Sequence, residues 1–173
     1  MTGLPETERN TRAADLRGVV LDVDGVLTDG RIIYTDDGHE SKAFHVQDGA
    51  SIKLLLAHDI EVAIITGRRS PAVARRAREL GIRHLVQGAG DKRAAYLGLV
   101  EQGFPDTDNA VVGDDLQDLA LFDAPGVTLA VTVPNAHPVV LERAHWVTQR
   151  SGGTGICVEL AMTVLTAQGR WPH

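Results

Sequence analysis

The run Val19-Val20-Leu21-Asp22-Val23-Asp24-Gly25-Val26-Leu27-Thr28 decides the fold of this chain. A short apolar, β-branched run that ends abruptly in acids and glycine is typical of a buried parallel strand that delivers polar groups at its C-terminal end. Residues two apart on a strand point to the same side, so Asp22 and Asp24 are expected to face one pocket. Two converging carboxylates repel each other unless a cation or a shared proton compensates. The run therefore predicts a site that combines a divalent metal, a nucleophile and an acid/base group.

The composition indicates one folded domain. The 173 residues are 43% hydrophobic and 23% charged, which suits a single well-packed core. No apolar run approaches the ~20 residues that cross a bilayer, and the polar residues 1–15 predict a flexible N-terminal tail. A formal charge of −6 argues against nucleic acids and anionic membranes as partners. The lone Cys157 excludes an internal disulfide and fits a reducing cytoplasm.

Apolar strand patterns alternate with helical patterns, which is typical of a parallel sheet covered on both faces. The sequence predicts an α/β fold, a Rossmann-like doubly wound parallel sheet, in one domain over residues 16–168 with a C-terminal tail at 169–173. The predicted strands are 18–23, 61–66, 84–87, 110–113, 127–131 and 146–148. The predicted helices are 49–58, 70–80, 91–102, 116–123, 136–144 and 156–168.

One segment breaks this alternation. Residues 31–46 read as two short strands around Asp37-Gly38 and predict a β-hairpin with an Asp-Gly turn. Because the hairpin directly follows the acidic loop, we expect it to project over the site as a flap. The other gaps between predicted strands hold single helices, so no cap domain fits.

Further polar residues follow the other predicted strands. Thr66-Gly67-Arg68 ends the second strand, Lys92 opens the helix after the third, and Gly113-Asp114-Asp115 ends the fourth, with Asp118 in the next helix. Ligands of open parallel sheets bind beyond the C-terminal ends of the strands. Each motif alone would pass for a solvated turn or a first-turn helix residue, but their concentration at one edge predicts a functional site.

In this order, the motifs resemble those of the haloacid dehalogenase superfamily of aspartate-nucleophile phosphatases. The resemblance implies that Asp22 attacks phosphorus and becomes an aspartyl-phosphate, which splits a hard hydrolysis into two easier steps. It implies that Asp24 protonates the leaving oxygen and then deprotonates the water that attacks the intermediate.

The same resemblance implies a magnesium site. Mg²⁺ would bind Asp22, the main-chain carbonyl of Asp24, and Asp114. Thr66 would donate a hydrogen bond to the phosphoryl group, and Lys92 would add positive charge there. The residues implied to orient the metal-bound waters and the lysine are Asp115 and Asp118.

A closer resemblance is to the capless family of 3-deoxy-D-manno-octulosonate 8-phosphate phosphatases. It rests on the flap, on Phe44-His45-Val46-Gln47-Asp48-Gly49 and on Ser151-Gly152-Gly153-Thr154-Gly155, although a flexible turn explains the last run equally well. The family resemblance implies a cytoplasmic homotetramer whose flaps pack together, with a neighbour's C-terminal tail helping to close each site. The implied substrate-binding residues are Asp24, His45, Val46, Gln47, Asp48, Gly49, Lys53, Gly67, Arg68, Arg76 and Lys92.

Alternatives stay open at this stage. The family usually has glycine at Ser51 and arginine at Lys53, so a nine-carbon ulosonate 9-phosphate or another sugar phosphate is the alternative substrate. A phospho-accepting receiver has similar residue types but places its lysine last, whereas Lys92 precedes Asp114-Asp115 here. A non-catalytic module is disfavoured because an unused acidic cluster would only destabilise the fold.

Overall fold

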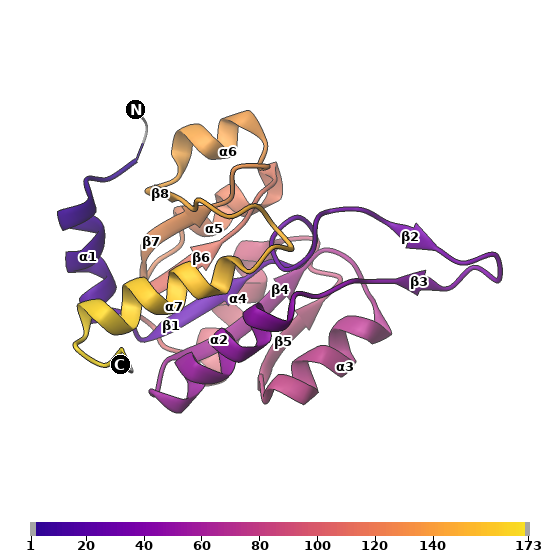
Figure 1. The fold of residues 1–173 in the computed structure, drawn as a ribbon, viewed down its shortest axis with the longest axis horizontal. Helices are drawn as coiled ribbons and strands as arrows, with labels where there is room; N and C mark the ends of the chain where they lie inside the picture. Colours follow the sequence, from indigo (N-terminus) through magenta and orange to yellow (C-terminus); the bar gives the residue numbers. More distant parts are fainter. Residues whose placement is uncertain (1–2, 172–173) are drawn as a thin grey trace.

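Six parallel strands form the central sheet of the computed structural model, which describes residues 3–171 (Figure 1). Their order is β5-β4-β1-β6-β7-β8. The strands are β1 Gly18–Leu21, β4 Glu61–Thr66, β5 His84–Gln87, β6 Asn109–Val112, β7 Val127–Thr132 and β8 Trp146–Val147. Strand β1 lies between β4 and β6 and is buried throughout, which explains its uninterrupted apolar sequence. The predicted doubly wound α/β sheet is confirmed.

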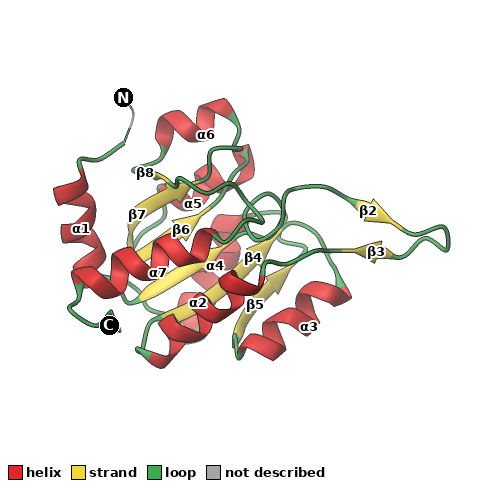
Figure 2. Ribbon diagram, in the orientation of Figure 1, coloured by secondary structure: helices red, strands yellow, loops and turns green. Residues whose placement is uncertain are grey.

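Helices cover both faces of the sheet (Figure 2). Helices α1 and α2 both pack on α7 at one face, whereas α4 packs with α5 on the other. The helices are α1 Glu6–Asp15, α2 Val46–Ala57, α3 Pro71–Leu80, α4 Lys92–Glu101, α5 Leu119–Phe122, α6 Pro138–Arg143 and α7 Ile156–Ala167, with a 3₁₀ turn at Leu116–Asp118. Across residues 3–171, every helix falls short of the length and apolar character that crossing a membrane requires.

Helix α2 begins three residues earlier than predicted. His45 is its N-cap, and the imidazole Nδ1 accepts a hydrogen bond from the main-chain N–H of Gln47 at 3.3 Å. The run from Val46 to Gly49 is therefore the first turn of a helix and not a loop.

The prediction of a flexible N-terminal tail at 1–15 was wrong, because Glu6–Asp15 forms helix α1. The helix packs on α7 through the fully buried Ala13, and Arg12 Nη1 donates to the main-chain oxygen of Thr128 at 2.8 Å. Helix α1 packs through a small apolar residue and the aliphatic parts of arginine side chains. These residues give no apolar pattern, so the sequence did not indicate a packing face. The domain therefore begins before residue 16.

The predicted hairpin is confirmed as the antiparallel pair β2 Ile33–Tyr34 and β3 Glu40–Ser41. It extends from the sheet as a long arm (Figure 1). At its tip the N–H of Thr35 donates to the carbonyl of His39 at 2.9 Å, and Gly38 takes the positive φ of 84° that the turn requires. No cap domain is present within residues 3–171.

Residues 169–171 of the predicted C-terminal tail at 169–173 lie far from the flap within their own chain (Figure 1). Arg170 Nη2 lies 3.4 Å from Asp59 Oδ2, just before strand β4 begins. Residues 172 and 173 of this tail lie outside the described residues.

Candidate active site

Asp22 stands directly after β1 at the edge of the sheet and is only 7% exposed. The N–H of Val23 donates to its Oδ1 at 2.7 Å, and Lys92 Nζ lies 2.8 Å from its Oδ2. The next turn passes through Gly25 with φ +88°, where a Cβ would lie 1.9 Å from Asp114 Oδ2. Only glycine allows the two acidic loops to approach this closely. The nucleophile candidate is thus held by a main-chain donor and an ammonium group.

Lys92 links the acids that come from different strands. It opens α4, and its side chain is 4% exposed, with Nζ 2.5 Å from Asp118 Oδ1 in addition to its Asp22 contact. The other oxygen of Asp118 accepts the N–H groups of Asp114 and Asp115 at 3.0 and 3.1 Å. Burial alone would lower the pKa of Lys92, but the two carboxylates outweigh it and raise the pKa, so the lysine is charged at neutral pH. Asp118 therefore orients both Lys92 and the loop that carries Asp114.

The carboxylates suit a hard divalent cation. Oxygens of Asp22, Asp114 and Asp118 lie within 4.8 Å of one another. Burial, followed by repulsion from neighbouring acids, raises the pKa of Asp22 to about 6 and that of Asp114 to about 7. Asp114 Oδ1 is buried and has no hydrogen-bond partner among the described residues. Because Asp118 is already held by three donors, Asp22 and Asp114 are the side chains that fit Mg²⁺.

One cavity of about 340 Å³ extends from Asp22 and Asp24 to the loop after β4, whereas Asp114 and Asp118 do not line it. Thr66 ends that strand and is 3% exposed, and the N–H of Arg68 lies 3.4 Å from its Oγ1. The structure thus brings together residues that the sequence analysis selected from four separate motifs. Those lining the cavity are Asp22, Asp24, Thr66, Gly67, Arg68, Lys92 and Asp115.

The remaining predicted substrate-binding residues do not line this cavity. His45, Asp48, Gly49 and Arg76 line a separate, smaller pocket with mostly apolar walls. Asp48 Oδ1 accepts the N–H of Cys157 at 2.7 Å and so ties α2 to the start of α7. Gln47 instead accepts a hydrogen bond from Arg150 at 2.9 Å, and Val46 and Lys53 are exposed. The seven residues outside the cavity are His45, Val46, Gln47, Asp48, Gly49, Lys53 and Arg76.

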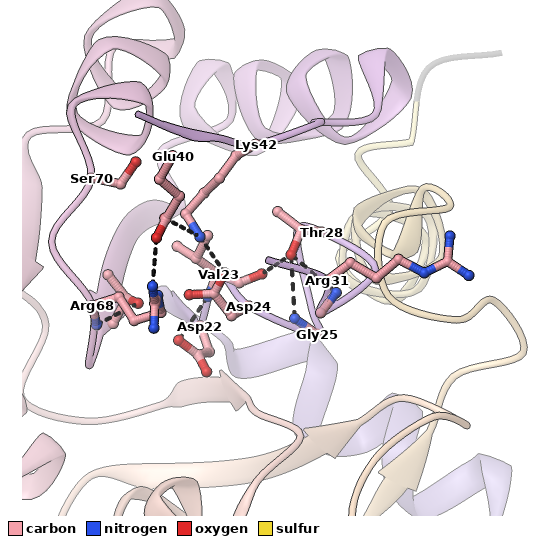
Figure 3. Close-up of polar contacts among 12 residues, drawn as sticks. Asp22, Val23, Asp24, Gly25, Thr28, Arg31, Glu40, Lys42, Arg68 and Ser70 are labelled. Atoms are coloured by element: carbon pink, nitrogen blue, oxygen red, sulfur yellow. Dashed lines mark hydrogen bonds and ion pairs between the residues drawn. The ribbon is translucent and has the colours of Figure 1, made fainter. Parts of the chain in front are cut away.

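Two flap residues that the sequence analysis did not select reach the catalytic loops (Figure 3). Lys42 has 2% of its side chain exposed, and its Nζ hydrogen-bonds to Asp24 Oδ1 and lies 3.0 Å from Glu40 Oε1. Glu40 Oε2 in turn lies 2.5 Å from Arg68 Nη2. Residues 40 and 42 are two apart in an extended segment that begins as strand β3 (Glu40–Ser41), so the period of the predicted hairpin could have indicated that they face the same side.

The glycine run near the C-terminus packs on the nucleophile loop. The N–H of Gly152 donates to Asn135 Oδ1 at 2.7 Å, and Asn135 Nδ2 donates to the carbonyl of Gly25 at 3.0 Å. Gly153 N donates to the carbonyl of Val26 at 2.9 Å. A Cβ on Gly152 would lie 1.8 Å from the Gly25 oxygen. These contacts hold the glycine run against the nucleophile loop, so the run is not a flexible turn.

Several known proteins are similar to this chain in sequence and in fold. No family model matches the chain. The 3-deoxy-D-manno-octulosonate 8-phosphate phosphatase of Escherichia coli K12 is 45% identical over 160 residues, which are 92% of this chain and 84% of the relative. A structure from Legionella pneumophila, described as a HAD superfamily (subfamily III A) hydrolase, is 45% identical with a TM-score of 0.90 and covers 95% of this chain and 90% of its own.

A third similar protein carries ligands. The 3-deoxy-D-manno-octulosonate 8-phosphate phosphatase of Moraxella catarrhalis, solved with a magnesium ion, a phosphate ion and KDO, is 40% identical with a TM-score of 0.89. The match covers 94% of this chain and 93% of the Moraxella chain. With a parallel sheet, no cap in residues 3–171, and the acids gathered around Lys92, the chain belongs to the 3-deoxy-D-manno-octulosonate 8-phosphate phosphatase family of the haloacid dehalogenase superfamily.

Proposed function

We propose that this phosphatase hydrolyses 3-deoxy-D-manno-octulosonate 8-phosphate to the free sugar acid and phosphate. The observation that carries the proposal is the placement of Asp22, which the Val23 N–H and Lys92 fix at one end of a cavity that also contains Asp24 and Thr66. The enzyme is a phosphoric monoester hydrolase by its family, and the named activity of its relatives supports this substrate.

Asp22 acts as the nucleophile. Its oxygen forms a bond to phosphorus while the bond from phosphorus to the sugar oxygen breaks, and Asp24 gives that oxygen a proton. Water then attacks the aspartyl-phosphate, the bond from phosphorus to the Asp22 oxygen breaks, and Asp24 takes a proton from the water. Thr66 and Lys92 bind the phosphoryl oxygens. Asp22, Asp114 and the carbonyl of Asp24 would hold Mg²⁺, which would supply the charge neutralisation that a carboxylate needs to approach a phosphate dianion.

Arg68 is the residue that we assign to the carboxylate of the sugar acid. It follows Thr66 by two residues, and 40% of its side chain is exposed at the cavity. A guanidinium group binds a carboxylate through two parallel hydrogen bonds. A nine-carbon ulosonate 9-phosphate presents the same two groups at a slightly greater separation, so it is the second candidate substrate.

Phosphate release across a panel of substrates tests this assignment. The panel contains eight- and nine-carbon ulosonate phosphates, pentose and hexose phosphates, and nucleotides, each with Mg²⁺ and with EDTA. We expect the highest kcat/KM for the octulosonate 8-phosphate and no turnover with EDTA. Asp22→Asn is expected to abolish turnover while the fold is retained. A preference for nucleotides would overturn the substrate, and turnover by the Asn variant would overturn the nucleophile.

We also infer a homotetramer in which flaps pack together and a neighbour's tail approaches the site. Ile32, Ile33 and Tyr34 on the flap are 48%, 47% and 64% exposed, and an isolated two-stranded hairpin is only marginally stable in water. Light scattering is expected to give four times the mass of the chain, and Ile33→Asp is expected to lower it. A monomeric wild-type protein, or unchanged kinetics after removal of the residues beyond Arg170, would contradict this arrangement.

We place the enzyme in the cytoplasm, since its single cysteine, Cys157, is a buried free thiol that fits a reducing compartment. Fractionation of the source cells would test this placement, and recovery with an oxidising compartment would contradict it.

A further inference from the structure

Lys42 occupies an unusual position for a flap residue. Residues 31–39 of the flap are exposed, yet the Lys42 side chain is 2% exposed and turns inward to the loop that carries Asp24 (Figure 3). Burial on its own would lower the pKa of this lysine, but its hydrogen bonds to Asp24 and Glu40 outweigh burial and raise the pKa. A buried cation that stays charged needs its anionic partners, so the position of Lys42 depends on these two acids.

The two oxygens of Asp24 are in different surroundings. Oδ1 accepts the hydrogen bond from Lys42. Oδ2 is buried and has no hydrogen-bond partner among residues 3–171. A carboxyl group that is held through one oxygen presents the other in a fixed direction, and Asp24 lines the cavity where the ester would bind. The oxygen left without a partner is the one that can carry the proton for the leaving group.

Glu40 holds Lys42 from the other side. Its Oε1 lies 3.0 Å from Lys42 Nζ and its Oε2 lies 2.5 Å from Arg68 Nη2, so the acid joins the lysine to the loop after β4. This second anchor limits the directions in which the ammonium group can move. Lys42 is therefore fixed between the flap acid and the acid/base candidate.

We propose that Lys42 is a positioning residue for the acid/base step: its ammonium group holds Asp24 Oδ1 so that Oδ2 faces the leaving oxygen. The proposal rests on the proposed function, since it assumes that Asp24 protonates that oxygen. It differs from a role in substrate binding, where Lys42 would contact the phosphate or the sugar itself, and from a role in holding the flap alone.

Leaving groups separate these roles. A sugar alcohol needs a proton to depart, whereas p-nitrophenol leaves readily as an anion. Loss of a group that acts through Asp24 should therefore slow the first chemical step for a sugar phosphate much more than for p-nitrophenyl phosphate. Positioned proton transfer contributes roughly 100- to 10,000-fold to rate, and misdirection of the carboxyl group should lose part of it.

The experiment is a single-turnover measurement with enzyme in excess and Mg²⁺ present. The variants are Lys42→Met, Asp24→Asn and the double variant, and the esters are p-nitrophenyl phosphate and the sugar phosphate that the wild-type enzyme hydrolyses fastest in the panel. Arg31→Met is the matched control, since Arg31 is a cation near the flap whose side chain is 82% exposed and points away from the site (Figure 3). Choosing the sugar phosphate from the panel keeps this test independent of the octulosonate assignment.

We expect Lys42→Met to slow the sugar phosphate by about 10- to 100-fold and the aryl phosphate by less than about threefold. The double variant should be no slower than Asp24→Asn, and the control should match the wild type. Equal slowing of both esters would overturn the proposal in favour of a structural role. If the fold-reductions in rate of the two single variants multiply in the double variant, the proposal would be overturned in favour of direct substrate binding by Lys42. If the Met variant does not fold, Lys42→Gln replaces it: this variant loses the charge but keeps a donor, so it should slow the sugar phosphate more than the aryl phosphate, by a smaller factor than the loss of the donor would.

Discussion

Replacement of Lys92 by methionine should reveal how strongly the acids of the site repel one another. Lys92 is the cation that touches both Asp22 and Asp118, at 2.8 and 2.5 Å, and its side chain is 4% exposed. Methionine fills nearly the same volume without the charge. The two carboxylates would then lie buried beside Asp114 with no ammonium group between them.

The size of the effect follows from the burial of these groups. Removing one member of a buried ion pair costs about 3–5 kcal/mol, because the remaining charges stay desolvated and unpaired. A chain of this length loses roughly 3 °C of Tm per kcal/mol, so we expect Tm to fall by roughly 9–15 °C in the absence of Mg²⁺. Added Mg²⁺ should restore part of this loss, since a ligand that binds only the folded state stabilises it.

The deficit should also depend on pH. The pKa of Asp22 is raised to about 6 and that of Asp114 to about 7, so the folded state binds more protons there than the unfolded state does. Without Mg²⁺, the free energy of unfolding should therefore rise as the pH falls through 7 and 6 towards the pKa values that these carboxyl groups have in the unfolded chain. The increase should be larger for Lys92→Met than for the wild type.

Chemical denaturation at pH 5 and pH 8, with Mg²⁺ and with EDTA, measures these quantities. Lys53→Met, at an exposed lysine on α2, is the stability control and should change the free energy of unfolding by no more than about 0.5 kcal/mol. A Lys92→Met loss below about 1 kcal/mol, unaffected by Mg²⁺ and pH, would refute the electrostatic argument.

Three further outcomes follow from the site. Asp114→Asn removes a proposed metal ligand and should raise the Mg²⁺ concentration for half-maximal activity at least ~10-fold, which a metal titration measures. It should not lower stability without metal, because it removes a carboxylate whose pKa is raised, and a thermal melt checks this. Gly152→Ala, whose Cβ would lie 1.8 Å from the Gly25 oxygen, should cost about 1–3 kcal/mol and lower kcat, whereas Gly98→Ala, with open space around it, should not destabilise. Mg²⁺ affinity should weaken as the pH falls below about 7, and calorimetry in buffers of different ionisation enthalpy should detect proton release on binding.

The parts of the site that lie at strand ends could be predicted from the sequence. Parallel strands meet at one edge, so apolar runs that end in polar residues specify both the sheet and the contents of that edge. Asp22, Thr66 and Asp114 come together in the structure for this reason. The hairpin was equally predictable, because an Asp-Gly turn between short strands is a local signal.

The parts that depend on tertiary packing were not predictable. Helix α1 is held by Ala13 and by the reach of Arg12 to β7, neither of which leaves an apolar periodicity in the sequence. The contact between Lys42 and Asp24 depends on where the base of the flap meets the loop after β1, and strand alternation specifies only which side a residue faces. The helical start at Val46 depends on a histidine cap, which is a less common N-cap than serine or aspartate.

Each of the two lysines of the site contacts a different one of the neighbouring carboxylates Asp22 and Asp24. Lys92 lies at the start of α4 and contacts Asp22, the proposed nucleophile. Lys42 follows the flap strand β3 and contacts Asp24, the proposed proton donor, so this contact depends on the position of the base of the flap. Motion of the flap would therefore alter proton transfer while leaving the nucleophile in place, and the leaving-group experiment on Lys42 measures that separation directly.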